Sequence, residues 1–250
     1  SDEQIKILRN PNNAKLRKIR GVAGSGKTLL LAKMAVDEYV KTQRKVLILT
    51  YNLSLRNYIY EQINRIPSDF SWDGFEIRNY HEFFKSKAME YNLQIKYLSD
   101  FENRYFFDRV KDQITRYNTI FIDEIQDYKE HWVEIIKKFF LAEGGSYTVF
   151  GDEKQNIYDR PMNPEDDKRP YTGVPGKYWN ILEETARLSN TIRELAQQFQ
   201  ETFLGNKYRK DLIKQTSVPI DFSNAFGTTT NTVNYQLLLR GNNSTYDLYK

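Results

Sequence analysis

The sequence contains no cysteine, no long apolar run and no signal-peptide pattern at its start. The absence of cysteine excludes disulfides and thiolate metal sites, and it is compatible with a reducing compartment. No stretch approaches the roughly 20 apolar residues that a membrane-spanning helix needs. We therefore expect a soluble, cytoplasmic protein with no membrane partner.

The sequence also has little excess of one charge over the other, since 37 basic and 33 acidic residues leave a formal net charge of +4. This balance does not by itself indicate a nucleic-acid partner, although it is consistent with a local basic groove. Hydrophobic residues make up 40% of the 250 positions and aromatic residues 14%. The chain can therefore fill the core of one large domain or of two modest ones.

Short strand-like segments alternate along the chain with longer segments of helical periodicity. This alternation indicates right-handed βαβ crossovers and a parallel sheet with helices on both faces, which is an α/β fold. The expected strands are residues 18–23, 45–51, 75–80, 118–123, 146–152 and 184–189. Because ligands bind at the carboxyl ends of the strands in such sheets, we expect one composite site at that edge.

Two stretches interrupt the alternation. Residues 83–117 lack a strand pattern and are expected to form a small helical insertion between two strands. Residues 160–178 hold four of the seven prolines and two of the twelve glycines, so we expect a loop there.

The stretch GVAGSGKT, residues 21–28, has the G-x-x-x-x-G-K-T spacing of a phosphate-binding loop, or P-loop. Its glycines let backbone N–H groups surround an anion, Lys27 supplies a positive charge to the β- and γ-phosphates, and Thr28 supplies a hydroxyl for Mg²⁺. A strand-like run precedes the loop, and a helical pattern whose N-terminus favours anions follows it. These flanks disfavour the alternative of a simple glycine-rich turn, and they predict a bound nucleoside triphosphate.

The stretch FIDEIQD, residues 121–127, places two adjacent carboxylates at the end of an apolar strand. Buried charges are costly there unless they meet a metal or transfer a proton. Asp123 suits the role of Mg²⁺ partner, and Glu124 that of the base that orients or activates the attacking water. In isolation the pair is also typical of an acidic helix cap. GDEKQNIY, residues 151–158, follows the next strand, where Gln155 is placed to reach the γ-phosphate.

In this order and spacing, GVAGSGKT, DEIQD and GDEKQNIY resemble the first RecA-like lobe of superfamily 1 helicases of the UvrD/Rep type. The resemblance implies a P-loop NTPase lobe over residues 1–187 and the start of a second lobe over residues 188–250. It also implies an ATP-dependent DNA helicase or single-stranded DNA translocase that uses ATP and Mg²⁺. Single-stranded DNA is the implied partner, and RNA is not excluded.

The same resemblance assigns roles to individual residues. The implied catalytic residues are Lys27, Asp123, Glu124, Gln155 and Arg193, the last as an arginine finger carried by LSNTIREL at 188–195. The implied ATP-binding residues are the adenine-reading Gln4 and then Gly21, Ala23, Gly24, Ser25, Gly26, Lys27 and Thr28. Mg²⁺ is assigned to Thr28 and Asp123, and single-stranded DNA to Tyr51, Asn52, His81 and Tyr158. Simpler alternatives are a core role for Tyr51, an ordinary loop position for His81 and a surface helix position for Arg193.

The chain departs from the family pattern at three places. Leu29 and Ile192 stand where the family often carries the arginine and tyrosine that flank adenine, so adenine contacts are expected to be less specific. After Tyr158 the chain continues DRPMNPEDD in place of an aromatic residue and R-G. The later family motifs do not follow residues 234–250. We expect a fragment of a longer protein rather than a degenerate module, because an opening strand without partners has unpaired edges.

Two other functions remain open from the sequence. The first is another P-loop phosphotransferase, for which DEIQD and GDEKQNIY have no evident use. The second is a nucleic-acid-binding switch that responds to nucleotide and does not unwind duplexes.

Overall fold

The structure is a computed structural model of the chain. It describes residues 1–9, 15–152, 162–163, 169–170, 173–175, 178–185, 190–199, 201–202 and 214–215. Contacts divide the chain into Ser1–Val218 and Pro219–Lys250, and the second unit lies outside the described residues. A lobe boundary after residue 187 stays a prediction.

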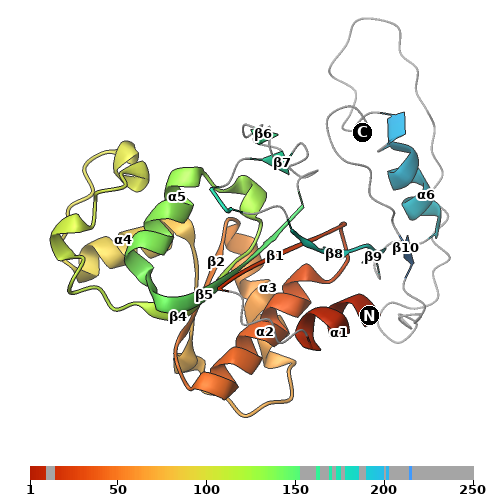
Figure 1. The fold of residues 1–250 in the computed structure, drawn as a ribbon, viewed down its shortest axis with the longest axis horizontal. Coiled ribbons are helices and arrows are strands. Elements are labelled where there is room, and N and C mark those ends of the chain that lie inside the picture. Colours follow the sequence, from red (N-terminus) through yellow and green to blue (C-terminus); the bar gives the residue numbers. More distant parts are fainter. Residues whose placement is uncertain are drawn as a thin grey trace, which may run out of the picture. The chain divides into compact units, whose positions relative to one another are not determined.

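A parallel six-stranded sheet, ordered β3-β2-β4-β5-β1-β8, forms the centre of the described fold (Figure 1). Its strands are β1 (Leu16–Gly21), β2 (Val46–Thr50), β3 (Phe75–Asn79), β4 (Tyr117–Ile122), β5 (Leu141–Gly151) and β8 (Asn180–Leu182). All five neighbouring pairs run parallel. Every residue of β2 is buried, as expected for a strand of a parallel sheet that is covered on both faces.

Of the strand expected at residues 184–189, the structure describes Glu184 and Thr185, and these two residues are not part of this sheet. The place of the expected strand is taken by β8, which pairs with the last three residues of β1. Beyond Gly21 the chain turns into the P-loop, so no strand remains there for residues after Leu182 to pair with. Residues Glu184–Thr185 instead form β9, which pairs with β10 (Lys214–Gln215).

Helices cover both faces of the sheet, which confirms the predicted fold class (Figure 1). Successive residues of the central strands point to opposite faces: Leu47 and Ile122 belong to one buried cluster, and Ile48 and Phe121 to the other. The first cluster includes residues of α4 (Tyr80–Glu90), α5 (Glu130–Ile135) and the π-helical turn η5 (Ile136–Phe140). The second includes residues of α1 (Asp2–Arg9), α2 (Lys27–Thr42) and α3 (Leu53–Asn64).

The remaining described elements are short. The 3-10 helices are η1 (Trp72–Gly74), η2 (Leu98–Glu102), η3 (Asp108–Val110) and η4 (Ile125–Asp127). The expected helical insertion consists of α4, η2 and η3, which lie between β3 and β4. The loop expected at 160–178 lies largely outside the described residues, within which β6 (Met162–Asn163) pairs with β7 (Arg169–Pro170). Helix α6 spans Asn190–Phe199, and among the described residues no helix is both long and apolar enough to cross a membrane.

Candidate nucleotide-binding site

The P-loop connects β1 to α2 at the carboxyl edge of the sheet (Figure 1). Gly24 and Gly26 have φ angles of 77° and 81°, in the left-handed region that favours glycine. A Cβ atom on Gly26 would also stand 2.4 Å from Nε2 of Gln4. Gly26 is the N-cap residue of α2, so the loop delivers its backbone directly to the N-terminus of a 16-residue helix. Such a helix end attracts anions.

Lys27 places a positive charge inside this loop. Its side chain is buried, and Nζ donates a hydrogen bond to the carbonyl oxygen of Gly21 at 2.8 Å. A second carbonyl, that of Val22, lies 3.4 Å from the same ammonium. The loop backbone therefore positions the charge where phosphates are expected to bind.

Thr28 and Asp123 meet next to the loop, although 95 positions separate them in the sequence. Thr28 Oγ1 donates to Asp123 Oδ2 at 3.5 Å, and the backbone N–H of Asp123 donates to the carbonyl of Leu49 at 2.8 Å. Burial raises the pKa of the Asp123 carboxyl, and the charge of Glu124 raises it further, against the opposing effect of Lys27. Burial disfavours the charged form of this carboxyl group, and a cation bound next to it would stabilise that form.

A hydroxyl and a carboxylate are oxygen donors that suit Mg²⁺, which binds few protein ligands and completes its coordination with substrate phosphates and water. The described residues hold no cluster of three or more His, Cys, Asp or Glu side chains suited to a metal. Thr28 and Asp123 thus fit a metal that is held partly by its nucleotide.

Glu124 follows in a strained backbone conformation, with a φ of 52°. A non-glycine residue in this region is uncommon, and such strain often occurs at functional sites. Its side chain accepts a hydrogen bond of 2.6 Å from Gln126 Nε2. Gln126 Oε1 in turn accepts from the backbone N–H of Asp152 at 3.0 Å. Gln126 therefore links the carboxylate pair to the end of β5.

The sequence reasoning did not include Gln126 among the site residues, although the DEIQD motif contains it. It also missed Leu55 and Tyr58 of α3. Together with the P-loop, Leu29 and Glu124, these two residues line a pocket of about 500 Å³. Leu55 and Tyr58 follow an ordinary helical pattern, so only the packing of α3 against α2 reveals them.

The structure places Gln4 beside the P-loop. Its Nε2 donates to the carbonyl of Ser25 at 2.9 Å. The preceding residue, Glu3, accepts hydrogen bonds from the backbone N–H groups of Glu183 and Glu184 at 2.8 and 3.2 Å. Helix α1 is thereby fixed next to both the loop and β8.

The predicted DNA contacts Tyr51 and His81 both pack against Trp132. The Tyr51 ring stacks on Trp132 with centroids 6.2 Å apart, and His81 meets it edge-on at 4.9 Å. Asn52 lies next to Tyr51 and caps α3, since its Oδ1 accepts from the backbone N–H of Ser54 at 3.0 Å. Partial burial lowers the pKa of His81, and the charge of Lys129 lowers it further. Trp132 is buried within this aromatic group, and the sequence reasoning did not identify it.

For three predicted positions the structure describes no side chain. Gln155 and Tyr158 lie outside the described residues. Arg193 belongs to α6, and its side chain is likewise not described. Their roles stay predictions.

A family model described as an AAA domain matches residues 4–161, which is more than half of the chain. The chain belongs to the AAA domain family. The matched range of this AAA domain begins at Gln4 and contains the P-loop, the carboxylate pair and GDEKQNIY. No curated protein matches it.

Solved structures show what the fold of this AAA domain resembles. The large terminase from a thermophilic bacteriophage is 15% identical at a TM-score of 0.51, over 86% of this chain and 53% of that one. Nonstructural protein 10, a helicase, from an arterivirus in complex with DNA is 12% identical at a TM-score of 0.38, over 80% and 42%. Methylated PRRSV nsp10, also a helicase, is 13% identical at 0.36, over 82% and 37%.

Of these three, the terminase alone exceeds a TM-score of 0.5, and at 15% identity it supports the α/β P-loop NTPase fold and nothing finer. The AAA domain spans between 37% and 53% of the three solved chains. The activity of any whole protein that contains it is therefore a matter for proposal.

Proposed function

We propose that this AAA domain is the ATP-binding and hydrolysing lobe of a UvrD/Rep-like DNA helicase or single-stranded DNA translocase. The observation that carries the proposal is the meeting of Thr28, Asp123 and Glu124 beside the P-loop. The motif order supports the helicase assignment, with a second lobe beginning near residue 188. A cytoplasmic location remains a prediction from the sequence.

In this proposal each site residue has its own role in ATP hydrolysis. Lys27 and the loop N–H groups bind the β- and γ-phosphates, and Gln4 contacts the adenine. Thr28 and Asp123 would hold Mg²⁺, which supplies positive charge to the phosphates when bound. Glu124 orients or activates the attacking water, and the hydrogen bond from Gln126 fixes its carboxylate. Gln155 and Arg193 contact the γ-phosphate in this proposal.

Single-stranded DNA would bind at Tyr51, Asn52, His81 and Tyr158. The first three follow the carboxyl ends of β2 and β3, so the strand would lie at the same edge of the sheet as the nucleotide. ATP binding would close two lobes on each other and hydrolysis would reopen them, which moves the strand by alternating grip.

The test is the ATPase rate of the 250-residue chain with and without single-stranded DNA. We expect stimulation by DNA, and we expect it to be lost in Lys27→Ala and Glu124→Gln. Glu124→Gln should lower turnover by about 100-fold or more, because a general base contributes roughly 10²–10⁴-fold. It should still bind ATP, whereas Lys27→Ala should bind it weakly. Robust duplex unwinding by this chain alone would contradict its assignment as a single lobe.

The main alternative is a nucleotide-dependent binding switch. ATP binding without turnover, together with DNA affinity that changes between the nucleotide-free and ATP-bound chain, would identify the switch and reject the motor. Transfer of phosphate to a small molecule would identify a phosphotransferase.

A further inference from the structure

A basic groove lies along β3, away from the P-loop. β3 is an edge strand and pairs with β2 alone among the described strands. The groove is a hollow of about 910 Å³ that runs between α3, α4 and the first residues of β4. We call it the β3 groove, and its charged lining residues are Arg44, Lys45, Arg56, Glu76, Arg78, Lys87, Glu90 and Arg116.

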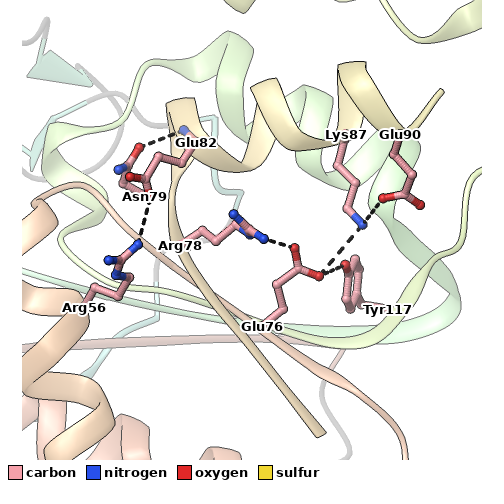
Figure 2. A network of polar contacts seen from close by, with 8 residues as sticks. All are labelled: Arg56, Glu76, Arg78, Asn79, Glu82, Lys87, Glu90 and Tyr117. Atoms are coloured by element: carbon pink, nitrogen blue, oxygen red, sulfur yellow. Dashed lines mark hydrogen bonds and ion pairs between the residues drawn. The ribbon is translucent and has the colours of Figure 1, made fainter. Parts of the chain in front are cut away.

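The carboxylates of the β3 groove are already paired with some of its cations (Figure 2). Glu76 lies 3.1 Å from Arg78 Nε and 3.8 Å from Lys87 Nζ. Glu90 lies 2.9 Å from the same buried ammonium of Lys87. Tyr117 adds a hydroxyl donor to Glu76. Arg78 and Lys87, which also line the groove, therefore offset its negative charges.

Of the other cations, Arg56 pairs with Glu82 at 3.2 Å, and the charge of Lys45 acts on the Glu90 carboxylate from a longer distance. Among the described residues, Arg44, Lys45 and Arg116 form no ion pair within 4 Å. Among the described residues, Arg116 donates to the carbonyl oxygens of Lys138 and Leu141, both at 3.0 Å, and these neutral acceptors leave its charge in place. Arg44 and Lys45 are exposed. The lining thus carries surplus positive charge that can bind the phosphates of an extended polyanion.

Exposed aromatic rings stand next to this charge. Tyr60 lines the groove, and its ring lies 5.2 Å from that of Trp72, centroid to centroid. The two residues are 38% and 41% exposed. Basic grooves flanked by exposed aromatics are typical of proteins that bind single strands, because bases stack on the rings while cations contact the backbone.

The edge strand itself disfavours a peptide as the occupant. Glu76 and Arg78 place charges on this edge strand, and charged residues on an edge strand oppose the pairing of an added peptide strand. One end of the groove also lies close to the proposed DNA contacts. Figure 2 shows the pair of Arg56 and Glu82. Arg56 is on the first turn of α3 after Asn52, and Glu82 follows His81 in the sequence.

We propose that the β3 groove binds the phosphodiester backbone of a single-stranded nucleic acid and extends its path beyond Asn52 and His81. The proposal rests on the nucleic-acid partner proposed above and adds a second contact surface to it. The strand then follows the free edge of β3, with Arg44, Lys45 and Arg116 on its phosphates and Tyr60 and Trp72 beside its bases.

The test compares the double variant Arg44→Gln/Lys45→Gln with the control Arg109→Gln/Lys111→Gln in the 250-residue chain. Each removes one exposed arginine and one exposed lysine, and the control pair lies outside the groove. Binding of a fluorescent oligothymidine of about 20 nucleotides, longer than the roughly 4–16 of one module, is measured by anisotropy over a salt series. The groove variant should bind several-fold more weakly. Its log–log salt slope should fall in magnitude by about 1.4, or about 0.7 per lost phosphate contact. The control should keep the wild-type values.

The outcomes separate the two proposals. If the wild-type chain binds the oligonucleotide and the groove variant binds it equally well with the same slope, the β3 groove is not part of the path and the proposed function stands. If the wild-type chain binds no oligonucleotide, both proposals fail. Equal affinity of the groove for poly-glutamate, lost in the same variant, would identify an acidic protein segment and reject a nucleic acid.

Photo-crosslinking gives an independent readout. An oligonucleotide that carries 5-iodouracil should crosslink to Tyr60 or Trp72, as mapped by mass spectrometry. Crosslinks confined to Tyr51 and His81 would overturn the proposal, since they would leave the strand at the carboxyl edge of the sheet.

Discussion

Gly26 combines two constraints in one residue. Its φ of 81° is costly for any residue with a Cβ, and Nε2 of Gln4 occupies the space that a Cβ would need. Gly144 offers a natural comparison, because its φ is 73° and no atom lies within 4 Å of its hypothetical Cβ. Both glycines have a left-handed backbone, but of the two only Gly26 also lacks space for a Cβ atom.

We expect Gly26→Ala to lower both stability and ATP affinity, and Gly144→Ala to lower stability alone. The left-handed backbone costs each variant about 1–2 kcal/mol. In Gly26→Ala the methyl group also displaces Gln4, and the double variant Gln4→Ala/Gly26→Ala should recover part of the lost stability. Thermal unfolding and ATP titration measure the two effects. Equal ATP affinity of Gly26→Ala and Gly144→Ala would show that the displacement of Gln4 does not affect ATP binding.

At the scale of elements, the loop after β2 serves both structure and proposed binding. Asn52 caps α3 through its side-chain oxygen, and the helix it starts supplies Tyr58 to the nucleotide pocket and Arg56 to the β3 groove. A loss of DNA binding in an Asn52 variant could therefore come from a frayed helix alone.

Two substitutions separate these explanations. Asn52→Ala removes the cap and should cost about 1 kcal/mol, which lowers the melting temperature by about 2–4 °C for a domain of this size. Asn52→Asp keeps a good cap, so stability should remain, while its negative charge should repel phosphate. We expect Asn52→Asp to weaken oligonucleotide binding at unchanged melting temperature. Unchanged binding in Asn52→Asp would restrict Asn52 to its structural role.

At the scale of the whole molecule, segments far apart in sequence hold the P-loop. Val22 N–H donates to the carbonyl of Leu182 at 3.3 Å, and Thr185 Oγ1 donates to the carbonyl of Ala23 at 3.1 Å. Glu3 ties α1 to the backbone after β8. The loop is thus held by α1, through Gln4, and by the end of β8 and the residues that follow it.

We expect Glu3→Ala to destabilise the fold by about 1–2 kcal/mol, since two hydrogen bonds to a charged, half-buried acceptor are lost. Once α1 is no longer held to the residues after β8, the P-loop should bind ATP more weakly. Asp2→Ala, which changes an exposed acid on the same helix, is the control and should have little effect. Urea unfolding and ATP titration are the measurements. Equal stability of the two variants would show that Glu3 does not fasten α1 to β8.

The sequence by itself determined the α/β fold class and the chemistry of the P-loop. Both depend on local patterns: alternating strand and helix periodicity, and glycines at fixed spacing before a lysine and a threonine. For the same reason it placed Asp123 and Glu124 at the end of a buried strand, where parallel strands bring them to the loop.

Only the tertiary structure decided what depends on pairing and packing between distant segments. It moved the sixth strand of the sheet to β8, because β1 ends at Gly21 and leaves later residues no partner. It brought Gln126 between Glu124 and Asp152, and Leu55 and Tyr58 to the nucleotide pocket. It also gathered the cations of five separate segments along β3, which a net charge of +4 spread over 250 residues does not reveal.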